Sequence, residues 1–124
     1  MTNEKRIFDL AERTEKFSEN IIYLINKIPK DIITVPLISQ LIRSGTSVGS
    51  NYCEADCAES RKDFEHKLSI CKKEAKETKY WLTILTKAKP DITQTIIPLI
   101  KEANELQLIF IAIIKKSKSH GYVE

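Results

Sequence analysis

Apolar residues recur at steps of three and four along nearly the whole chain, and this periodicity limits the possible folds more than any other feature. The longest uninterrupted run lies in residues 61–88, at Phe64, Leu68, Cys71, Ala75, Thr78, Leu82 and Leu85. Such steps place side chains on one face of an α-helix, which has about 3.6 residues per turn. With only three glycines and four prolines, the chain favours a few long helices over many short strands.

Four helices are predicted from the periodicity, over about residues 5–28, 35–58, 61–88 and 95–116, followed by a frayed tail at 117–124. Pro29 ends the first helix, because proline lacks a backbone donor and disfavours helix in the residue before it. Pro36 is tolerated in a first turn, and Ser60 is the expected N-cap of the third helix. Pro98 fits the first turn of the fourth helix if Thr95 is its cap. The short connections predict one all-α domain spanning the 124 residues, an antiparallel up-and-down four-helix bundle.

The segment 44–51, Ser-Gly-Thr-Ser-Val-Gly-Ser-Asn, has the composition of a loop, because each glycine in a helix costs roughly 1 kcal/mol relative to alanine. Yet the periodicity passes through it unbroken, at Leu41, Gly45, Val48 and Tyr52. A loop would not be expected to keep this helical spacing of apolar residues. We therefore predict helix here, with small residues that let another backbone approach closely.

The predicted fourth helix carries more apolar residues than one buried face requires. From Ile96 to Ile114 the only charged residues are Lys101, Glu102 and Glu105. A helix that buries one face needs about three apolar positions in seven. The helix is either centrally placed or buries a second face against another subunit. Because a lone four-helix bundle has no fully enclosed position, the pattern favours the subunit contact.

Composition and charge narrow the functional classes without selecting one. There is no run of about 18 apolar residues and no signal-peptide core, so we expect a cytoplasmic protein without membrane spans. The three cysteines are an odd number, which fits reduced thiols. The formal charge is +3, but the excess of basic residues lies after residue 60. A basic second half suits an anionic partner without requiring one.

A few residues have spacings that could support metal chemistry. Cys53 and Cys57 lie four apart and could share a soft metal with Cys71 or His66, but structural zinc sites usually have a second closely spaced pair. Asp63 and His66 form half of the carboxylate and histidine pattern of a di-iron bundle, without a second copy. We predict no metal and no cofactor. With no nucleophile motif either, we predict that the protein is not an enzyme, a small metal-dependent enzyme being the weakest alternative.

A polar stripe follows one edge of the predicted second helix, at Arg43, Ser47, Asn51 and Glu54. These side chains could form a partly buried hydrogen-bond network that fixes helix register, or they could line a ligand site in the wall of the bundle. The structural interpretation is favoured. On the third helix one flank carries Glu74 and Glu77 beside Trp81, and we predict that Arg43 pairs with this flank.

The opposite flank of the third helix is basic. It carries Lys72, Lys73, Lys76, Lys79 and Lys87, with Tyr80 among them and Lys62 further toward its start. Such a row is usually a solvated face, but with little interleaved acid it would also attract phosphates. An antiparallel fourth helix ends near the start of the third, so Lys115, Lys116 and Lys118 are expected to extend the same patch.

Three segments carry a family resemblance: 40–55, with Arg43, Ser47, Asn51 and Glu54; Ser60-Arg61-Lys62-Asp63-Phe64; and 73–82, Lys-Glu-Ala-Lys-Glu-Thr-Lys-Tyr-Trp-Leu. Together they resemble the bacterial four-helix bundle proteins encoded in intervening sequences of large-subunit ribosomal RNA genes, to which the accessory variability determinant of diversity-generating retroelements is similar. The resemblance implies a homopentameric ring. For the retroelement relatives it implies basic surfaces that engage nucleic acid and a reverse transcriptase. The signature residues Arg43, Ser47, Asn51, Glu54, Asp63 and Phe64 are interpreted as fold-defining.

Two functions follow as expectations. The first is a non-catalytic oligomeric scaffold that binds RNA or DNA weakly through its lysine-rich faces. The alternative is a protein-interaction module, for example one accessory to a reverse transcriptase, without direct nucleic-acid binding. The partners expected are therefore further copies of the chain, a nucleic acid and a protein.

Overall fold

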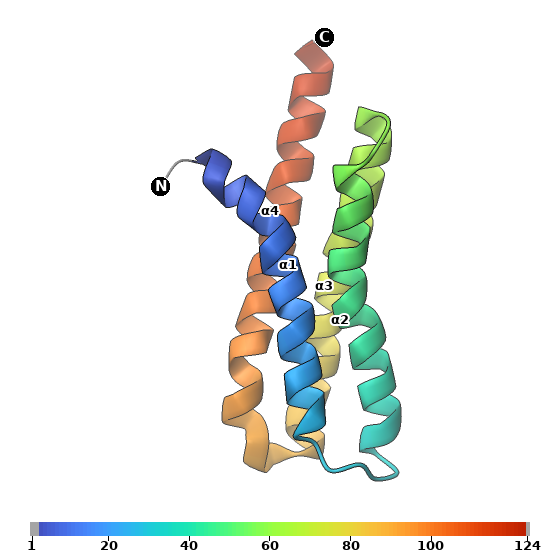
Figure 1. Ribbon diagram of the computed structural model, residues 1–124, viewed down its shortest axis with the longest axis vertical. Helices are drawn as coiled ribbons and strands as arrows, with labels where there is room; N and C mark the ends of the chain where they lie inside the picture. Colours follow the sequence, from blue (N-terminus) through green and yellow to red (C-terminus); the bar gives the residue numbers. More distant parts are fainter. Residues whose placement is uncertain (1–2, 124) are drawn as a thin grey trace.

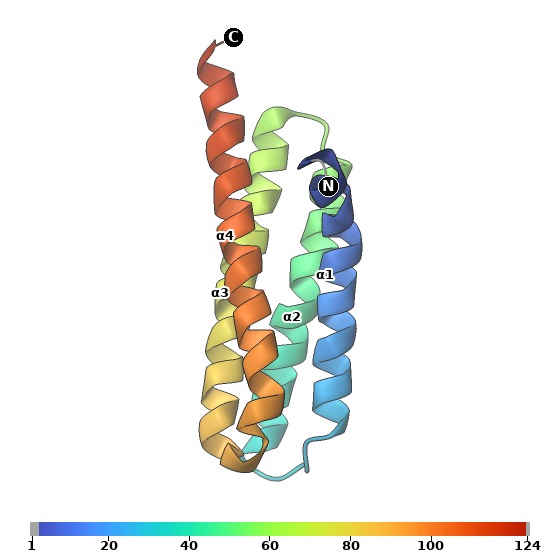
Figure 2. The ribbon, with the colours of Figure 1, turned by 90° about the vertical axis from the view of Figure 1, so that its left-hand side faces the viewer.

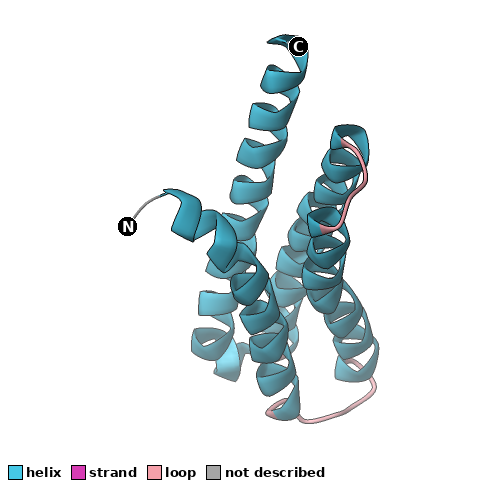
Figure 3. Ribbon diagram, turned by 45° about the horizontal axis from the view of Figure 1, so that its top comes forward, coloured by secondary structure: helices cyan, strands magenta, loops and turns pink. Residues whose placement is uncertain are grey.

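The computed structural model describes residues 3–123, with side chains from Leu10 to Ser119. Its elements are four helices and one short 3-10 turn: α1 (Asn3–Asn26), α2 (Thr34–Asp56), α3 (Arg61–Ala88), η1 (Pro90–Ile92) and α4 (Thr93–Val123). No strand occurs among the described residues, and only short connections separate the helices (Figure 3). None of these helices is long and apolar enough to span a membrane.

The helices alternate in direction, so the predicted all-α, up-and-down four-helix bundle is confirmed (Figure 1). The α1–α2 and α3–α4 connections lie at one end, and the α2–α3 connection lies at the other end with the start of α1 and the end of α4. Contact is extensive along α1–α2, α2–α3 and α3–α4 but slight between α1 and α4. The start of α1 diverges from the bundle, and the end of α4 projects beyond the α2–α3 connection (Figures 1 and 2).

The predicted apolar stripes form the core. The fully or almost fully buried side chains include Leu10, Thr14, Phe17, Ile21, Leu24, Ile28, Leu41, Val48, Tyr52, Ala55, Leu68, Cys71, Ala75, Thr78, Leu82, Leu85, Ile96, Leu99, Ala103, Leu106, Phe110 and Ile114. All four helices contribute, so none can bury its apolar face alone.

The Gly/Ser-rich segment of α2 is helical, as predicted, and its glycines lie against α1. A Cβ on Gly45 would be 3.1 Å from Ile21 Cγ1, and one on Gly49 would be 3.4 Å from the backbone oxygen of Thr14. Ser18 on α1 also donates to the Gly45 carbonyl, at 3.4 Å. The small residues therefore bring two backbones close together, which offsets the low helix propensity of glycine.

The start of α2 is fixed by a reciprocal cap that the sequence analysis missed. The Asp31 carboxylate accepts the backbone N–H groups of Ile33 and Thr34, each at 2.9 Å, and the Thr34 hydroxyl accepts from Asp31 N at 2.9 Å. Lys89 Nζ, after α3, lies 2.8 Å from Asp31 Oδ2. The lysine and these backbone donors lower the pKa of Asp31. The contact ties together the two connections at this end of the bundle.

The bounds of α3 match the prediction. The Ser60 hydroxyl accepts from Asp63 N at 3.0 Å, which confirms the predicted N-cap. Phe64, the next signature residue, is partly buried against the core. The first two helices end two residues earlier than predicted, at Asn26 and Asp56.

α4 starts about two residues before the predicted residue 95 and extends well beyond its predicted end. The helix begins at Thr93, directly after η1, and Pro98 therefore lies inside it. Proline has no N–H to donate to the backbone carbonyl four residues earlier. Because Pro98 is exposed, this carbonyl lies near solvent. The predicted frayed tail is helical to Val123, beyond the predicted end near Lys116, and Ser117 donates to Glu65 Oε2 on α3 at 2.6 Å. No proline interrupts this stretch, and residue 124 lies outside the described residues.

Candidate nucleic-acid interface

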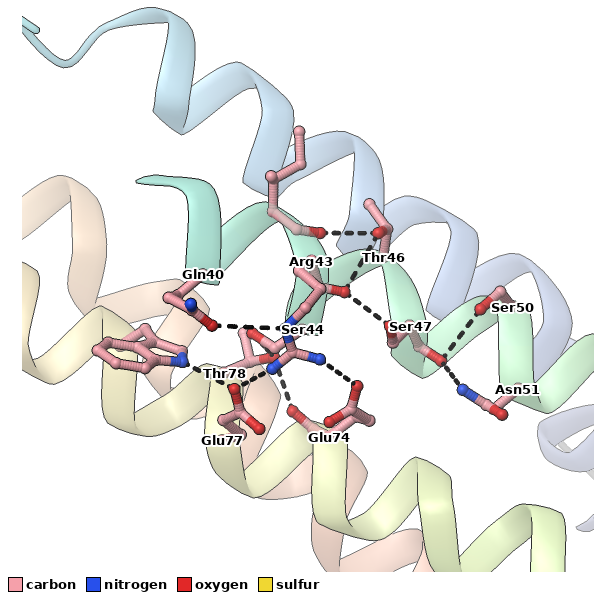
Figure 4. Close-up of polar contacts among 12 residues, drawn as sticks. Gln40, Arg43, Ser44, Thr46, Ser47, Ser50, Asn51, Glu74, Glu77 and Thr78 are labelled. Carbon is pink, nitrogen blue, oxygen red and sulfur yellow. Dashed lines mark hydrogen bonds and ion pairs between the residues drawn. The ribbon is translucent and has the colours of Figure 1, made fainter. Parts of the chain in front are cut away.

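Arg43 extends from α2 to two glutamates on the facing edge of α3 (Figure 4). Its Nη1 donates to Glu74 Oε2 at 2.9 Å, and its Nη2 donates to Glu77 Oε2. Gln40 Oε1 accepts from its Nε at 3.4 Å. Glu74 is only 7% exposed, so the guanidinium compensates a carboxylate that water hardly reaches. The predicted pairing of Arg43 with this flank is confirmed.

The same cluster orders the indole ring of Trp81. Trp81 Nε1 donates to Glu77 Oε2 at 3.0 Å. This bond and the guanidinium of Arg43 lower the pKa of Glu77 against the opposing effect of burial. Next to it, the hydroxyls of Ser44 and Thr78 form a buried hydrogen bond of 3.0 Å between α2 and α3. The α2–α3 seam is therefore held by polar as well as apolar contacts.

The other members of the polar stripe do not join this cluster. Ser47 donates to the Arg43 carbonyl at 2.7 Å, and Asn51 donates to the Ser47 carbonyl at 2.8 Å, so both bond within α2. Glu54 pairs with Lys67 on α3 at 2.9 Å and raises the pKa of that lysine. The single network suggested by the sequence is thus three separate sets of contacts, because serine and asparagine side chains reach their own helix backbone first.

The predicted lysine face lies on the solvent side of α3. Lys62, Lys73, Lys76 and Lys87 are exposed and Lys72 is half-buried. Lys79, at the α4 edge, is half-buried and donates to Asn104 Oδ1 at 2.9 Å. Lys115 and Lys116 on α4 are also exposed. Lys115 lies three turns beyond Asn104 on nearly the same side of α4, so it extends the face from the neighbouring helix. The term lysine face is used below for Lys62, Lys72, Lys73, Lys76, Lys79, Lys87, Lys115 and Lys116.

The lysine face contains few counter-charges: Glu65 lies among its lysines, and Glu77 is near Lys73 at one edge. Among the described side chains, none of its lysines is ion-paired with a carboxylate. The acidic residues on the flanks of α3 and α4 have other partners. Arg43 holds Glu74 and Glu77, whereas Ser117 bonds Glu65. The face therefore presents its positive charge to solvent.

Two further carboxylates are held by Arg13 of α1, a contact that the sequence analysis missed. Arg13 Nε lies 2.7 Å from Glu102 Oε2, and its Nη2 lies 2.8 Å from Glu105 Oε1. The hydrogen bond to Glu102, followed by that to Glu105, raises the pKa of Arg13. The bridge joins α1 to α4 where their other contacts are few. Arg13 is next to the buried Thr14, and Glu102 is next to the buried Ala103. These positions at the edges of the buried faces of α1 and α4 are the sequence signal that could have predicted the ion pair.

The cysteines and His66 do not assemble a metal site. Cys53 on α2 and Cys57, directly after its end, are exposed, whereas Cys71 is buried and donates to the Val48 carbonyl at 3.5 Å. Burial raises the pKa of Cys71 to about 12. No group of three or more His, Cys, Asp and Glu side chains suited to a metal ion occurs in the part of the chain that the structure describes, so the predicted alternative based on these cysteines and Asp63 is not supported.

Comparison with known proteins shows which family this bundle belongs to. The sequence model of the 23S rRNA-intervening sequence proteins matches residues 7–112, most of the chain. The chain belongs to the 23S rRNA-intervening sequence protein family. The match includes the segments that carry Arg43, Ser60 and Trp81, as the resemblance predicted. No curated protein sequence matches significantly.

A solved structure is similar to most of the bundle. It is described as a protein with unknown function from the S23 ribosomal protein family of Bacteroides thetaiotaomicron, solved at 1.70 Å resolution. The chain is 33% identical to it with a TM-score of 0.75, over 85% of this chain and 97% of that one. Neither the family name nor this description names an enzymatic activity.

Proposed function

We propose that the protein is a non-catalytic, oligomeric helical-bundle scaffold that binds RNA or DNA through the lysine face. One observation carries the proposal: the lysines have no carboxylate partner among the described side chains, while Arg13 and Arg43 hold the neighbouring glutamates. Unpaired lysines bind phosphates and release counterions, which gives affinity without sequence selectivity. The 23S rRNA association in the family name suggests RNA as the first ligand to test, and a cytoplasmic location is part of the same proposal.

The lysine face can be tested by charge reversal. The double variant Lys73→Glu/Lys76→Glu should weaken binding to a labelled RNA by at least tenfold at low salt, since two phosphate contacts become repulsive. The slope of log affinity against log salt should fall by about two. Fluorescence anisotropy at several salt concentrations measures both quantities.

A matched control is Lys27→Glu/Lys30→Glu, two exposed lysines in the α1–α2 connection. It makes the same change in net charge away from the lysine face. Its mass by light scattering is compared with that of the wild type, because the assembly proposed below uses the α1–α2 connection. No binding by the wild type at low salt, affinity that is indifferent to salt, or equal losses in both double variants would contradict the proposal.

The proposed assembly, a pentameric ring by family resemblance, needs an apolar surface. Most of the exposed large apolar side chains lie on α1, the α1–α2 connection and the first half of α2, at Ile22, Tyr23, Ile32, Ile33, Val35 and Ile42. On α4, Leu108 is the large apolar side chain with comparable exposure, while Phe110 is fully buried. This distribution favours the α1–α2 connection, in place of the second face of α4, as the main contact between copies.

Ile32→Asp should lower the mass measured by light scattering, because Ile32 is 91% exposed and its burial between copies would be lost. Leu108→Asp is the control on α4 and should leave the assembly intact. The wild type should have a mass several times that of the 14.2 kDa chain. A monomeric wild type, or dissociation caused only by Leu108→Asp, would contradict this arrangement.

The same exposed apolar residues support the second candidate function, a protein-interaction module. A protein partner such as a reverse transcriptase, suggested by the resemblance to the retroelement determinant, would bury Ile32, Ile33 and Val35. Purification from the native host after nuclease treatment should then retain that partner. Loss of every associated protein on nuclease treatment would exclude direct contact with it.

A further inference from the structure

Tyr80 lies within the lysine face and is 55% exposed. It projects from α3 in nearly the same direction as Lys62 and Lys87, with Lys73 and Lys76 on either side, as the 100° rotation per residue requires. Lys73 and Lys87 are each seven residues away, about 10 Å along the helix axis. Lys76 is one turn away. A planar aromatic surface is thus flanked by cations on both sides along the helix axis.

The Tyr80 ring is supported from one side. It meets the Trp81 ring in an edge-to-face contact, with centroids 5.0 Å apart and planes inclined by 74°. Trp81 is bonded to Glu77, which is held in turn by Arg43 on the neighbouring helix. This chain of contacts restricts the tyrosine in advance, which reduces the entropy lost when a ligand binds.

The edge-to-face geometry leaves a stacking surface available. If the edge of Tyr80 points to Trp81, Trp81 covers neither face of the tyrosine ring. If the edge of Trp81 points to Tyr80, Trp81 covers one face only. In either arrangement a second planar ring can stack on Tyr80 without displacing Trp81.

We propose that Tyr80 is a stacking platform for an unpaired nucleobase, and that the lysine face therefore prefers single-stranded nucleic acid to a duplex. The inference rests on the proposed function, because the flanking lysines must bind the phosphates on either side. Bases in a duplex are already stacked on their neighbours and cannot reach the ring. Since every base has a π-face, the platform tolerates any sequence.

The test compares Tyr80→Leu with Tyr80→Phe in the full chain. Leucine keeps an apolar side chain but removes the ring, whereas phenylalanine keeps the ring and removes only the hydroxyl. Tyr80→Leu should weaken binding of a 12-nucleotide single strand by about 5- to 100-fold. Tyr80→Phe should stay within about twofold of the wild type. Affinity for a 12-base-pair RNA duplex should be unchanged in both variants, and the salt dependence should be unchanged because no ionic contact is removed.

The probes are oligouridine and oligothymidine, so that the RNA and DNA sources are tested separately. A loss in either probe supports the platform, and the probe with the higher wild-type affinity identifies the ligand. Trp81 is the only tryptophan in the chain and adds a second measurement. Its fluorescence should change when a single strand binds the wild type, and the change should be smaller in Tyr80→Leu. Because Tyr80 is exposed, circular dichroism should show that both variants are folded.

The outcomes separate this inference from the proposed function. If the wild type binds no nucleic acid, or if Lys73→Glu/Lys76→Glu has no effect, the lysine face is not an interface and both proposals fail. If the wild type binds single strand and duplex equally and Tyr80→Leu changes neither affinity, the stacking platform is refuted while the lysine interface stands.

Discussion

Replacing Arg43 with methionine should lower the free energy of unfolding by about 2–3 kcal/mol. The substitution keeps most of the apolar stem but leaves the carboxylate of Glu74, 7% exposed, without its cation. Removing one partner of a fully buried ion pair costs about 3–5 kcal/mol, and the half-exposed Arg43 places this pair below that range. Urea denaturation followed by circular dichroism measures the change.

Two matched variants test that explanation. Arg13→Met removes an arginine that also holds two glutamates, but Glu102 and Glu105 have side chains 28% and 62% exposed, so the loss should be about 1 kcal/mol or less. In the Arg43→Met background, Glu74→Gln should recover part of the lost stability because the uncompensated charge is gone. Equal losses at Arg43 and Arg13, or no recovery by Glu74→Gln, would show that the effect does not come from the burial of Glu74.

Truncating Phe110 to alanine should lower the free energy of unfolding by about 3–5 kcal/mol. Phe110 is fully buried and its ring contacts that of Tyr52, with centroids 6.4 Å apart, so truncation leaves a cavity between α4 and α2. The measurement is denaturant unfolding at fixed protein concentration, since an oligomer couples stability to assembly.

Leu108, two residues earlier on the same helix, provides the control for Phe110. Its side chain is 57% exposed, so Leu108→Ala should change the stability by no more than about 0.5 kcal/mol. A small effect of Phe110→Ala, or an equal effect of Leu108→Ala, would mean that α4 is buried in another way, for example against a second copy of the chain.

Most of the helices could be predicted from the sequence because their limits depend on local chemistry. The apolar periodicity predicted that the helix continues through Gly45 and Gly49, and the N-cap residue Ser60 predicted the start of α3. The start of α4 could not be predicted in the same way. Whether Pro98 can lie inside a helix depends on its exposure, which only the packed bundle determines.

The contacts of the candidate site were partly predictable for the same reason. Arg43 and Glu74 lie on facing edges of consecutive helices, so periodicity alone brought them together. The bridge between Arg13 and Glu102 joins the first and last helices, and the contact of Lys89 with Asp31 joins two connections. Such contacts depend on how the helices are arranged in space. The spacing of residues within one helix does not predict this arrangement.

The two arginine clusters also determine the direction in which a charged polymer can lie on this surface. Each combines one guanidinium with two carboxylates and so retains one unit of net negative charge, at the α2 side of α3 for Arg43 and at the α1 side of α4 for Arg13. The cationic strip between them is thus bordered by acid along both long sides. A polyanion that crossed the strip would be repelled at either border, so a bound strand would run parallel to the helix axes.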